Sequence, residues 1–125
     1  MIQLKSVREI EIMAAGGRIL ALTHAHLRAK VRAGMSTGEL DRIAEDFIRS
    51  HDGALPAFKG LYGFPGAICI SVNDEIVHGI PSPKRLLVEG DIVKLDVGVQ
   101  YQGMFTDAAI TVPVDEVSSN SGMLE

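Results

Sequence analysis

Apolar and small residues in the first part of the chain recur at helical spacing. Ser6-Val7-Arg8-Glu9 has the pattern of a capping box, the sequence signature of a helix start. The positions that then repeat at steps of three and four are Val7, Ile10, Met13, Ala14, Gly17, Leu20, Ala21, Leu27 and Val31. This pattern predicts a long amphipathic helix that ends near Ala33-Gly34, because glycine commonly terminates helices. His24 falls on its apolar side and is expected to pack in the core.

A second helix is predicted after Ser36. Ser36-Thr37-Gly38-Glu39 is another capping box, and a helical apolar series follows it, formed by Leu40, Ile43, Ala44, Phe47 and Ile48. The helix is expected to close at His51-Asp52-Gly53. Residues 53–66 are rich in glycine, proline and aromatic residues, which predicts an irregular loop. A loop this apolar either packs under another element or lines a pocket.

The remaining pattern is that of strands. Residues 67–72 form a short apolar run, and residues 88–114 read as two strands joined by the turn Tyr101-Gln102-Gly103-Met104. The polar residues 115–125 predict a disordered or non-native tail after a domain of residues 1–114. The expected fold class is therefore α/β (α+β), with two amphipathic helices packed on an antiparallel sheet.

Two carboxylates interrupt the apolar pattern of the hairpin. If Gln102-Gly103 is a two-residue turn, counting back from it sets Asp96 opposite Ala109 and Gly98 opposite Asp107. All four side chains then share one face, with the Cα atoms of the two aspartates on a diagonal of roughly 7–8 Å.

The small residues of this patch should leave space for one or two metal ions. Two like charges on a half-buried sheet must share a proton or bind a cation, and a hard cation with oxygen ligands is the favoured interpretation. The alternative is structural, with Asp107 at a strand end and Asp96 on an exposed edge.

His78 differs in its setting from the other three histidines. It ends an apolar segment, and Gly79 and Pro81 restrict the backbone directly after it. Such a loop can present one side chain from a rigid support. The structural alternative is a hydrogen-bonded histidine at a strand end.

Composition narrows the class of protein. The chain has 125 residues, of which 46% are hydrophobic, and this is enough for one domain with its own core. Its net charge of −4 and scattered basic residues give no case for binding nucleic acid or an anionic membrane surface. Cys69 is the single cysteine, and the sequence has no apolar leader or membrane-length segment, so a cytoplasmic location is expected.

Three motifs together resemble a known family. They are Ser71-Val72-Asn73-Asp74-Glu75-Ile76-Val77-His78-Gly79-Ile80-Pro81, then Glu89-Gly90-Asp91-Ile92-Val93-Lys94-Leu95-Asp96-Val97-Gly98, and finally Gly103-Met104-Phe105-Thr106-Asp107. Over residues 1–114 the chain resembles the amino-terminal half of a type I methionine aminopeptidase. The resemblance implies half of a pita-bread fold. Proline-specific relatives of that fold are disfavoured by the His78-Gly79-Ile80-Pro81 block.

The resemblance also implies an activity and a site. A member of the family removes the amino-terminal methionine from nascent proteins and peptides with two divalent ions, which can be Co, Mn, Fe or Zn. By position, Asp96 would chelate one ion, Asp107 would bridge both, and His78 would hydrogen-bond the scissile peptide and act in catalysis. The residues at positions that line the methionine pocket are Phe58, Leu61, Phe64 and Cys69.

The family's ligand set has five members, two Asp, one His and two Glu, and the last three belong to a carboxy-terminal half that this sequence lacks. The chain by itself is therefore expected to hold metal poorly and to be inactive or very weak. An alternative hypothesis is a non-catalytic half-fold module that self-associates or binds peptides. The expected partners are the amino terminus of a peptide or nascent chain and, for a half fold, a second copy in a simple or segment-swapped dimer.

Overall fold

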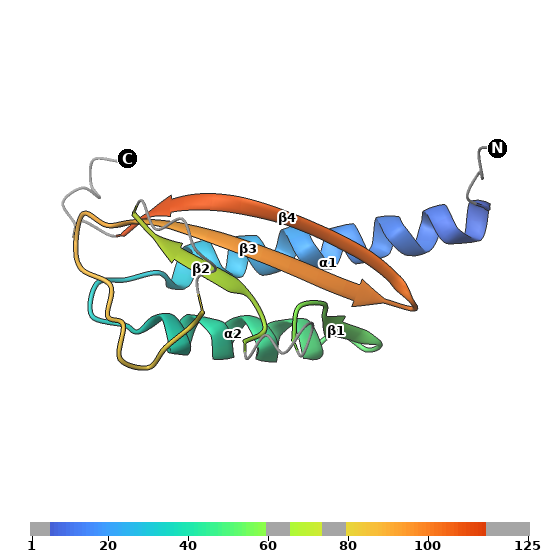
Figure 1. The fold of residues 1–125 in the computed structure, drawn as a ribbon. Coiled ribbons are helices and arrows are strands. Elements are labelled where there is room, and N and C mark those ends of the chain that lie inside the picture. Colours follow the sequence, from blue (N-terminus) through green and yellow to red (C-terminus); the bar gives the residue numbers. More distant parts are fainter. Residues whose placement is uncertain (1–5, 60–65, 74–79, 115–125) are drawn as a thin grey trace.

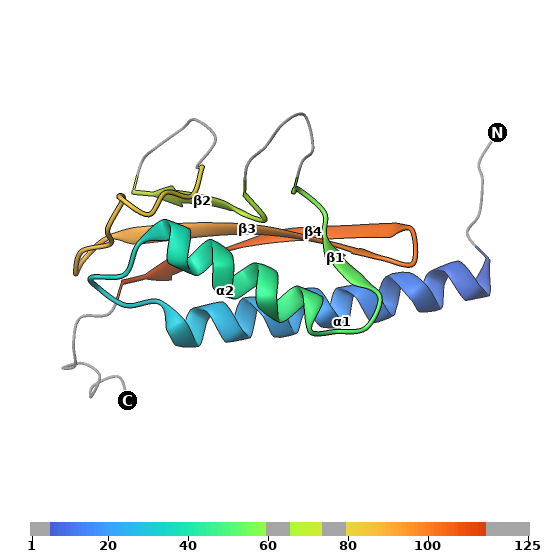
Figure 2. The same ribbon diagram turned by 90° about the horizontal axis from the view of Figure 1, so that it is seen from below.

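The structure, a computed structural model, describes residues 6–59, 66–73 and 80–114, in which two helices cover one face of an antiparallel sheet (Figures 1 and 2). This confirms the predicted arrangement of helices and sheet. The elements in chain order are α1 (Val7–Lys30), α2 (Thr37–Arg49), β1 (Ala54–Pro56), β2 (Cys69–Val72), β3 (Ile92–Tyr101) and β4 (Met104–Pro113). Neither helix is long and apolar enough to cross a membrane, a finding that applies to the described residues. The predicted tail, residues 115–125, lies outside them.

Helix α1 starts at the predicted capping box. The backbone N–H of Glu9 donates to Ser6 Oγ at 3.1 Å, and the N–H of Ser6 donates to Glu9 Oε1 at 3.0 Å. The helix ends at Lys30, earlier than predicted, because Val31 has extended backbone and buries its side chain. Gly34, with φ +94°, instead lies in the connection to α2, where its N–H donates to the carbonyl of Leu87 at 2.8 Å.

The predicted apolar face of α1 is only partly correct. The buried residues are Gly16, Ile19, Leu20, Thr23, His24 and Leu27, so His24 packs in the core as predicted. Val7 is 72% exposed and Ile10 is 55% exposed, because the first turns of α1 extend beyond the hairpin (Figures 1 and 2). Ala14 and Ala21 are also exposed. Some of the apolar residues of this helix therefore do not pack in the core.

Helix α2 agrees closely with the sequence prediction. Ser36 is its N-cap and accepts the N–H of Glu39 at 3.0 Å. The helix ends at Arg49, and the next residues make a turn before Gly53, which has φ +87°. Nδ1 of His51 lies 2.9 Å from the carbonyl oxygen of Phe47, so His51 has the structural role at the helix end that was expected.

Strand β3 is the centre of the sheet. It pairs along its whole length with β4 on one edge, while β1 and β2 share the other edge. The prediction of an irregular loop is wrong at Ala54–Pro56, where Ala54 and Pro56 are buried and the segment pairs with residues 99–101. Proline is tolerated here because the strand lies at an edge.

Strand β2 is shorter than the predicted 67–72. It begins only at Cys69, because the N–H groups of Ala67 and Ile68 donate to Oδ1 of Asp41 in α2, at 2.7 and 2.9 Å. The residues just before the strand are therefore held by the helix layer.

The hairpin has the predicted register. Tyr101 pairs with Met104, and Gln102 and Gly103 both have positive φ, as a type I′ turn requires. The side chains of β3 that face the helices are fully buried and form the middle of the core, namely Val93, Leu95, Val97 and Val99. The opposite face of the hairpin carries its polar residues.

Candidate metal centre

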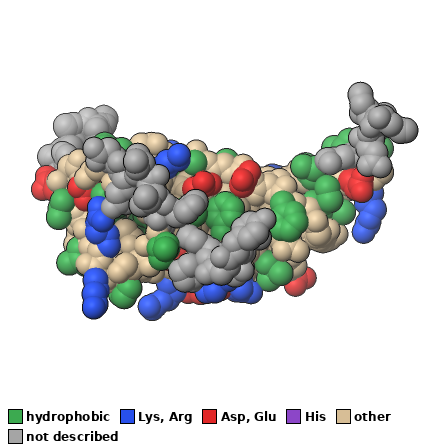
Figure 3. All heavy atoms as spheres, viewed as in Figure 1, with side chains coloured by type: hydrophobic (Ala, Val, Ile, Leu, Met, Phe, Trp, Pro, Cys, Tyr) green, Lys and Arg blue, Asp and Glu red, His purple; other side chains and the backbone are tan. Residues whose placement is uncertain are grey.

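Asp96 and Asp107 lie on the outer face of the sheet, away from the helices. Asp96 pairs with Ala109 of β4 and with Cys69 of β2, while Gly98 pairs with Asp107. The predicted shared face is therefore confirmed, and the diagonal places the two aspartate Cα atoms about 7–8 Å apart. Figure 3 shows acidic side chains near the middle of this face, bordered by hydrophobic ones.

The charge of Asp107 affects the titration of Asp96. Burial raises the pKa of Asp96, and the negative charge of Asp107 raises it further, while Lys94 and His24 partly offset these effects. Asp107 itself is exposed. A partly buried carboxylate next to a second one favours a bound proton or a bound cation.

We expect Asp107→Asn to lower the pKa of Asp96 toward its ordinary value, because the substitution removes one cause of the shift. A carbon-detected NMR titration of the Asp96 carboxyl measures this, with the remote and exposed Asp46→Asn as the control. Because the pKa is raised in the folded state, the contribution of Asp96 to stability is complete below the unfolded-state pKa. It is lost as the pH rises through the folded-state value. An unchanged Asp96 titration in Asp107→Asn would show that the carboxylates do not interact.

The space that was predicted to be open beside Gly98 is filled by Ala57 and Phe58. A Cβ atom added to Gly98 would lie 3.1 Å from Cβ of Ala57 and 3.2 Å from two ring carbons of Phe58. The N–H of Ala57 also donates to the carbonyl of Gly98 at 3.0 Å. Glycine at position 98 thus lets Phe58 pack directly onto the strand beside the carboxylates, while Ala109 on the other side is exposed.

A small apolar pocket adjoins the acidic pair. It has a volume of about 320 Å³ and is lined by Ala57, Phe58, Phe105, Thr106 and Asp107. The sequence prediction included Phe58 but missed Phe105, whose side chain is 58% exposed. The period-two alternation that links Asp107 to its face also places Phe105 there, so the signal was present in the sequence.

Cys69 lies beside Asp96 in the adjoining strand. Burial raises the pKa of its thiol, and the negative charges of Asp96 and Asp41 raise it further. The side chain therefore remains a neutral thiol, which suits a wall of a pocket better than a nucleophile. The other predicted site residues, Leu61, Phe64 and His78, lie outside the described residues.

Two side chains that the sequence prediction did not assign support this region. Asp41 fixes the residues immediately before Cys69 through the two hydrogen bonds described above. Asn73, with φ +57°, accepts the N–H of Ile92 at 2.9 Å and donates to Asp91 at 3.0 Å. Asn73 therefore ties the end of β2 to the start of β3.

His24 of α1 lies buried on the face of the hairpin that packs against the helices, near Ala108 and Asp96. Burial lowers its pKa, while the backbone of Ala108 and the charge of Asp96 partly offset this effect and the charge of Arg28 adds to it. Its Nε2 atom and Oγ1 of Thr106 are buried without a hydrogen-bond partner among the described residues.

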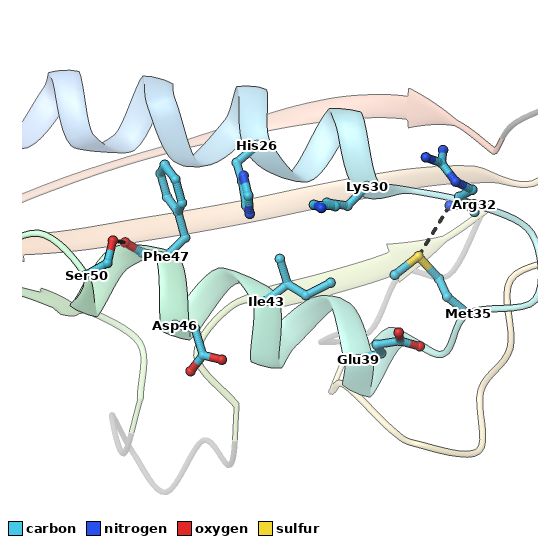
Figure 4. A pocket seen from close by; sticks show the side chains of 9 residues that line it. All are labelled: His26, Lys30, Arg32, Met35, Glu39, Ile43, Asp46, Phe47 and Ser50. Carbon is cyan, nitrogen blue, oxygen red and sulfur yellow. Dashed lines mark hydrogen bonds between the residues drawn. The ribbon is translucent and has the colours of Figure 1, made fainter.

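A larger groove lies in the helix layer, between α1 and α2 (Figure 4). It has a volume of about 730 Å³ and is lined by His26, Lys30, Arg32, Met35, Glu39, Ile43, Asp46, Phe47 and Ser50. The ring of His26 stacks on Phe47 with centroids 4.3 Å apart. The sheet separates this groove from the acidic pair, so the groove has no part in the candidate site.

The acidic pair fits part of a metal site. Carboxylates are ligands of divalent cations, and both aspartates project from one rigid hairpin. The described segments contain no group of three or more His, Cys, Asp or Glu side chains able to hold an ion. Asp96 and Asp107 therefore suit two positions of a larger ligand set.

Comparisons with known proteins show which family the chain resembles. The model of metallopeptidase family M24 matches residues 11–123. Methionine aminopeptidase 1 of Bacillus subtilis is 49% identical over 99% of this chain, and the Clostridium perfringens methionine aminopeptidase is 50% identical over the same share. Each alignment covers 49% of the relative, so the chain spans about half the length of the curated relatives it matches.

Solved structures agree on the fold. The methionine aminopeptidases of Rickettsia prowazekii and Thermotoga maritima superpose with TM-scores of 0.86 at 34% and 36% identity, over 99% of this chain and 49% of theirs. Aminopeptidase P of Escherichia coli superposes with a TM-score of 0.76 at 25% identity. The prediction of the amino-terminal half of a pita-bread fold is therefore confirmed.

Proposed function

We propose a function for this chain on the ground that it belongs to metallopeptidase family M24, whose model matches most of its length. The chain takes part in the metal-dependent removal of the amino-terminal methionine from proteins and peptides, and it supplies part of the metal site. The observation that carries the proposal is the placement of Asp96 and Asp107 on one face of the hairpin. The high identity to methionine aminopeptidases favours methionine over other amino-terminal residues.

Asp96 and Asp107, which share one face of the hairpin, would hold the divalent ions through their carboxylate oxygens. When bound, such ions polarise the scissile carbonyl group and lower the pKa of a bound water, and aminopeptidases are among the two-metal enzymes for which this chemistry is known. The oxygen ligands are compatible with Mn, Fe, Co or Zn.

The apolar surroundings of the pair would bind the substrate side chain. Phe58 packs beside the carboxylates and Cys69 adjoins Asp96, so both could contact a methionine side chain held at this face. A flexible thioether adapts well to such walls. Leu61 and Phe64 would complete the pocket, and His78 would donate a hydrogen bond to the substrate peptide and stabilise the developing oxyanion.

The substrate would be the free amino terminus of a peptide or nascent chain in the cytoplasm. Two carboxylates from one hairpin hold a divalent ion only weakly, because the family's remaining ligands come from the other half of the fold. The 125-residue chain alone is therefore expected to release methionine very slowly or not at all.

A chimera tests this function. The chain is joined to the carboxy-terminal half of the Bacillus subtilis relative, which is 49% identical to it over the matching half. We expect this chimera to release methionine from a methionyl-alanyl peptide when Mn²⁺ or Co²⁺ is added, and to lose the activity with EDTA.

The control is the same chimera carrying Asp96→Ala, which should fold but release no methionine. A peptide with leucine in place of methionine tests the pocket and should be cleaved more slowly. The proposal is wrong if the chimera folds and binds metal but cleaves no methionyl peptide.

A further inference from the structure

The start of helix α2 is bonded to residues 81–85, a segment far along the chain that lies beside it in Figures 1 and 2. Oγ1 of Thr37 donates to the carbonyl of Ser82 at 3.2 Å and accepts the N–H of Ser82 at 2.9 Å. The N–H of Gly38 donates to the same carbonyl at 3.0 Å, and the N–H of Thr37 donates to the carbonyl of Arg85 at 2.9 Å. Both polar backbone groups of Ser82 are therefore bonded to the first turn of α2, where helix N–H groups need partners from outside the helix.

Gly38 allows segment 81–85 to lie directly against the helix. A Cβ atom added to Gly38 would lie 2.9 Å from the backbone nitrogen of Pro83 and 3.0 Å from the carbonyl carbon of Ser82. These are backbone atoms, so a larger residue at position 38 would have to displace the segment. Thr37 is 2% exposed, and α2 packs in the core through Leu40, so the helix is a rigid support.

A second close contact joins segment 81–85 to the residues that precede β2. A Cβ atom added to Gly66 would lie 2.8 Å from two ring carbons of Pro81 and 3.1 Å from Oδ1 of Asp41. Asp41 belongs to α2 and accepts the two N–H groups that follow Gly66. Helix α2 therefore holds two segments that are distant in sequence against each other.

Segment 81–85 follows His78 closely in the sequence. His78 lies outside the described residues, and Ser82 is four positions after it. Four residues reach about 14 Å at most. The ring of Pro81 restricts its own backbone and that of Ile80, so a displacement of Ser82 is passed on along the chain toward His78.

We propose that Thr37 is a positioning residue for His78 in the removal of amino-terminal methionine, an inference that rests on the proposed function. Thr37 fixes the backbone of Ser82, and this anchor lets His78 donate its hydrogen bond to the substrate peptide. A donor to a developing oxyanion acts only in the correct position, and a misplacement of about 1 Å can lower the rate by about 100-fold.

The proposal separates the chemical step from metal binding. The hydrogen bonds of Thr37 lead to segment 81–85, whereas Asp96 and Asp107 are placed by the pairing of β3 with β4. Loss of the Thr37 hydroxyl should therefore lower the rate of peptide cleavage and leave the metal affinity unchanged.

Hydrogen exchange of the Ser82 amide tests the anchor without relying on turnover. In Thr37→Val this amide loses its acceptor, so we expect it to exchange about tenfold faster or more in the 125-residue chain. Thr37→Ser keeps the hydroxyl group and should restore slow exchange. Equal exchange in Thr37→Val and the unchanged chain would overturn the proposal.

The chimera described above tests the role in catalysis. Thr37→Val should lower kcat by about tenfold or more, while KM and the affinity for Mn²⁺ stay within about twofold, and Thr37→Ser should restore most of kcat. Gly38→Ala should also lower kcat, because its methyl group displaces Ser82 and Pro83. Alanine is the better helix former, so this variant keeps the test valid if Thr37→Val fails to fold.

Thr23→Val is the matched control. Thr23 is also a buried helical threonine, and its Oγ1 donates at 2.7 Å to the carbonyl of Ile19 in the same helix. The substitution removes a buried hydroxyl group away from segment 81–85, so kcat should stay near that of the unchanged chimera. Circular dichroism shows whether each variant is folded. An equal loss of kcat in Thr23→Val and Thr37→Val would show a general effect of stability and overturn the proposal.

A double-mutant cycle with His78→Ala decides whether Thr37 acts through His78. If it does, Thr37→Val should lower kcat by less than about twofold once His78 is absent. Losses that multiply in the double variant would overturn the proposal in a chimera that is otherwise active. An inactive chimera would instead refute the proposed function, and with it the role of Thr37 in catalysis, while amide exchange would still report separately on the anchor at Ser82.

Discussion

Replacing Asp41 with alanine is expected to lower the free energy of unfolding by about 2–4 kcal/mol. The carboxylate accepts the N–H groups of Ala67 and Ile68 at 2.7 and 2.9 Å, and both residues are buried. Alanine would leave two buried donors without a partner, and hydrogen bonds to charged groups contribute about 1.5–3 kcal/mol each. Urea denaturation at neutral pH measures the change.

Asp41→Asn is the matched control. Both N–H groups donate to the same oxygen, Oδ1, so an amide oxygen can accept both, and the change in stability should stay within about 1 kcal/mol. Equal destabilisation by alanine and asparagine would contradict this account of the contact.

The pH dependence of the same variant has a defined sign. Burial raises the pKa of Asp41, while the two backbone hydrogen bonds and Lys59 lower it only in part. A carboxyl with a raised folded-state pKa makes its contribution to stability below the unfolded-state pKa and loses it as the pH rises through the folded-state value. Asp41→Asn should remove this loss, so the difference in stability between acidic and neutral pH should shrink.

The Asp41 contact also matters for the candidate site. It holds the chain immediately before Cys69, and Cys69 pairs with Asp96. In the Asp41→Ala chimera we therefore expect methionine release to fall even at temperatures where the fold survives.

The features that could be predicted from sequence are those fixed by local chemistry. The capping box at Ser6 and the N-cap at Ser36 set the helix starts, because the serine side chain accepts a backbone N–H group that has no partner within the helix. The turn at Gln102-Gly103 fixed the register of ten strand pairs, and with it the shared face of Asp96 and Asp107. Once a turn type is known, alternation carries the prediction along the whole hairpin.

The features that were missed depend on distant parts of the chain. Nothing near Asp41 in sequence indicates that its carboxylate caps a segment 26 residues later. The burial of Ala54 and Pro56 comes from pairing with β3, which local composition does not reveal. Val7 and Ile10 of α1 were predicted to face the core but are exposed, because spacing shows which residues share a face and does not show which element covers that face.

The largest effect on metal binding is expected from Asp96→Ala. Asp96 is the more buried of the two carboxylates, and burial and the charge of Asp107 both raise its pKa. Its negative charge is therefore unfavourable in the metal-free protein, and a bound cation that neutralises this charge should contribute most of its binding free energy here. Removal of a residue that only orients a ligand weakens metal affinity by about 10–100-fold, so loss of the ligand itself should weaken Mn²⁺ affinity by at least about 100-fold.

The free Mn²⁺ signal in electron paramagnetic resonance measures this affinity in the chimera, without relying on turnover. Asp46→Asn, which changes an exposed carboxylate of α2, is the control and should bind Mn²⁺ normally.

The affinity for Mn²⁺ should also fall as the pH drops, because protons compete for Asp96, and the fall should begin above the pH at which an ordinary aspartate titrates. Asp96→Asn should stabilise the metal-free protein at neutral pH, since it removes a buried charge. If Asp96→Ala keeps its Mn²⁺ affinity, the outer face of the hairpin does not hold the metal.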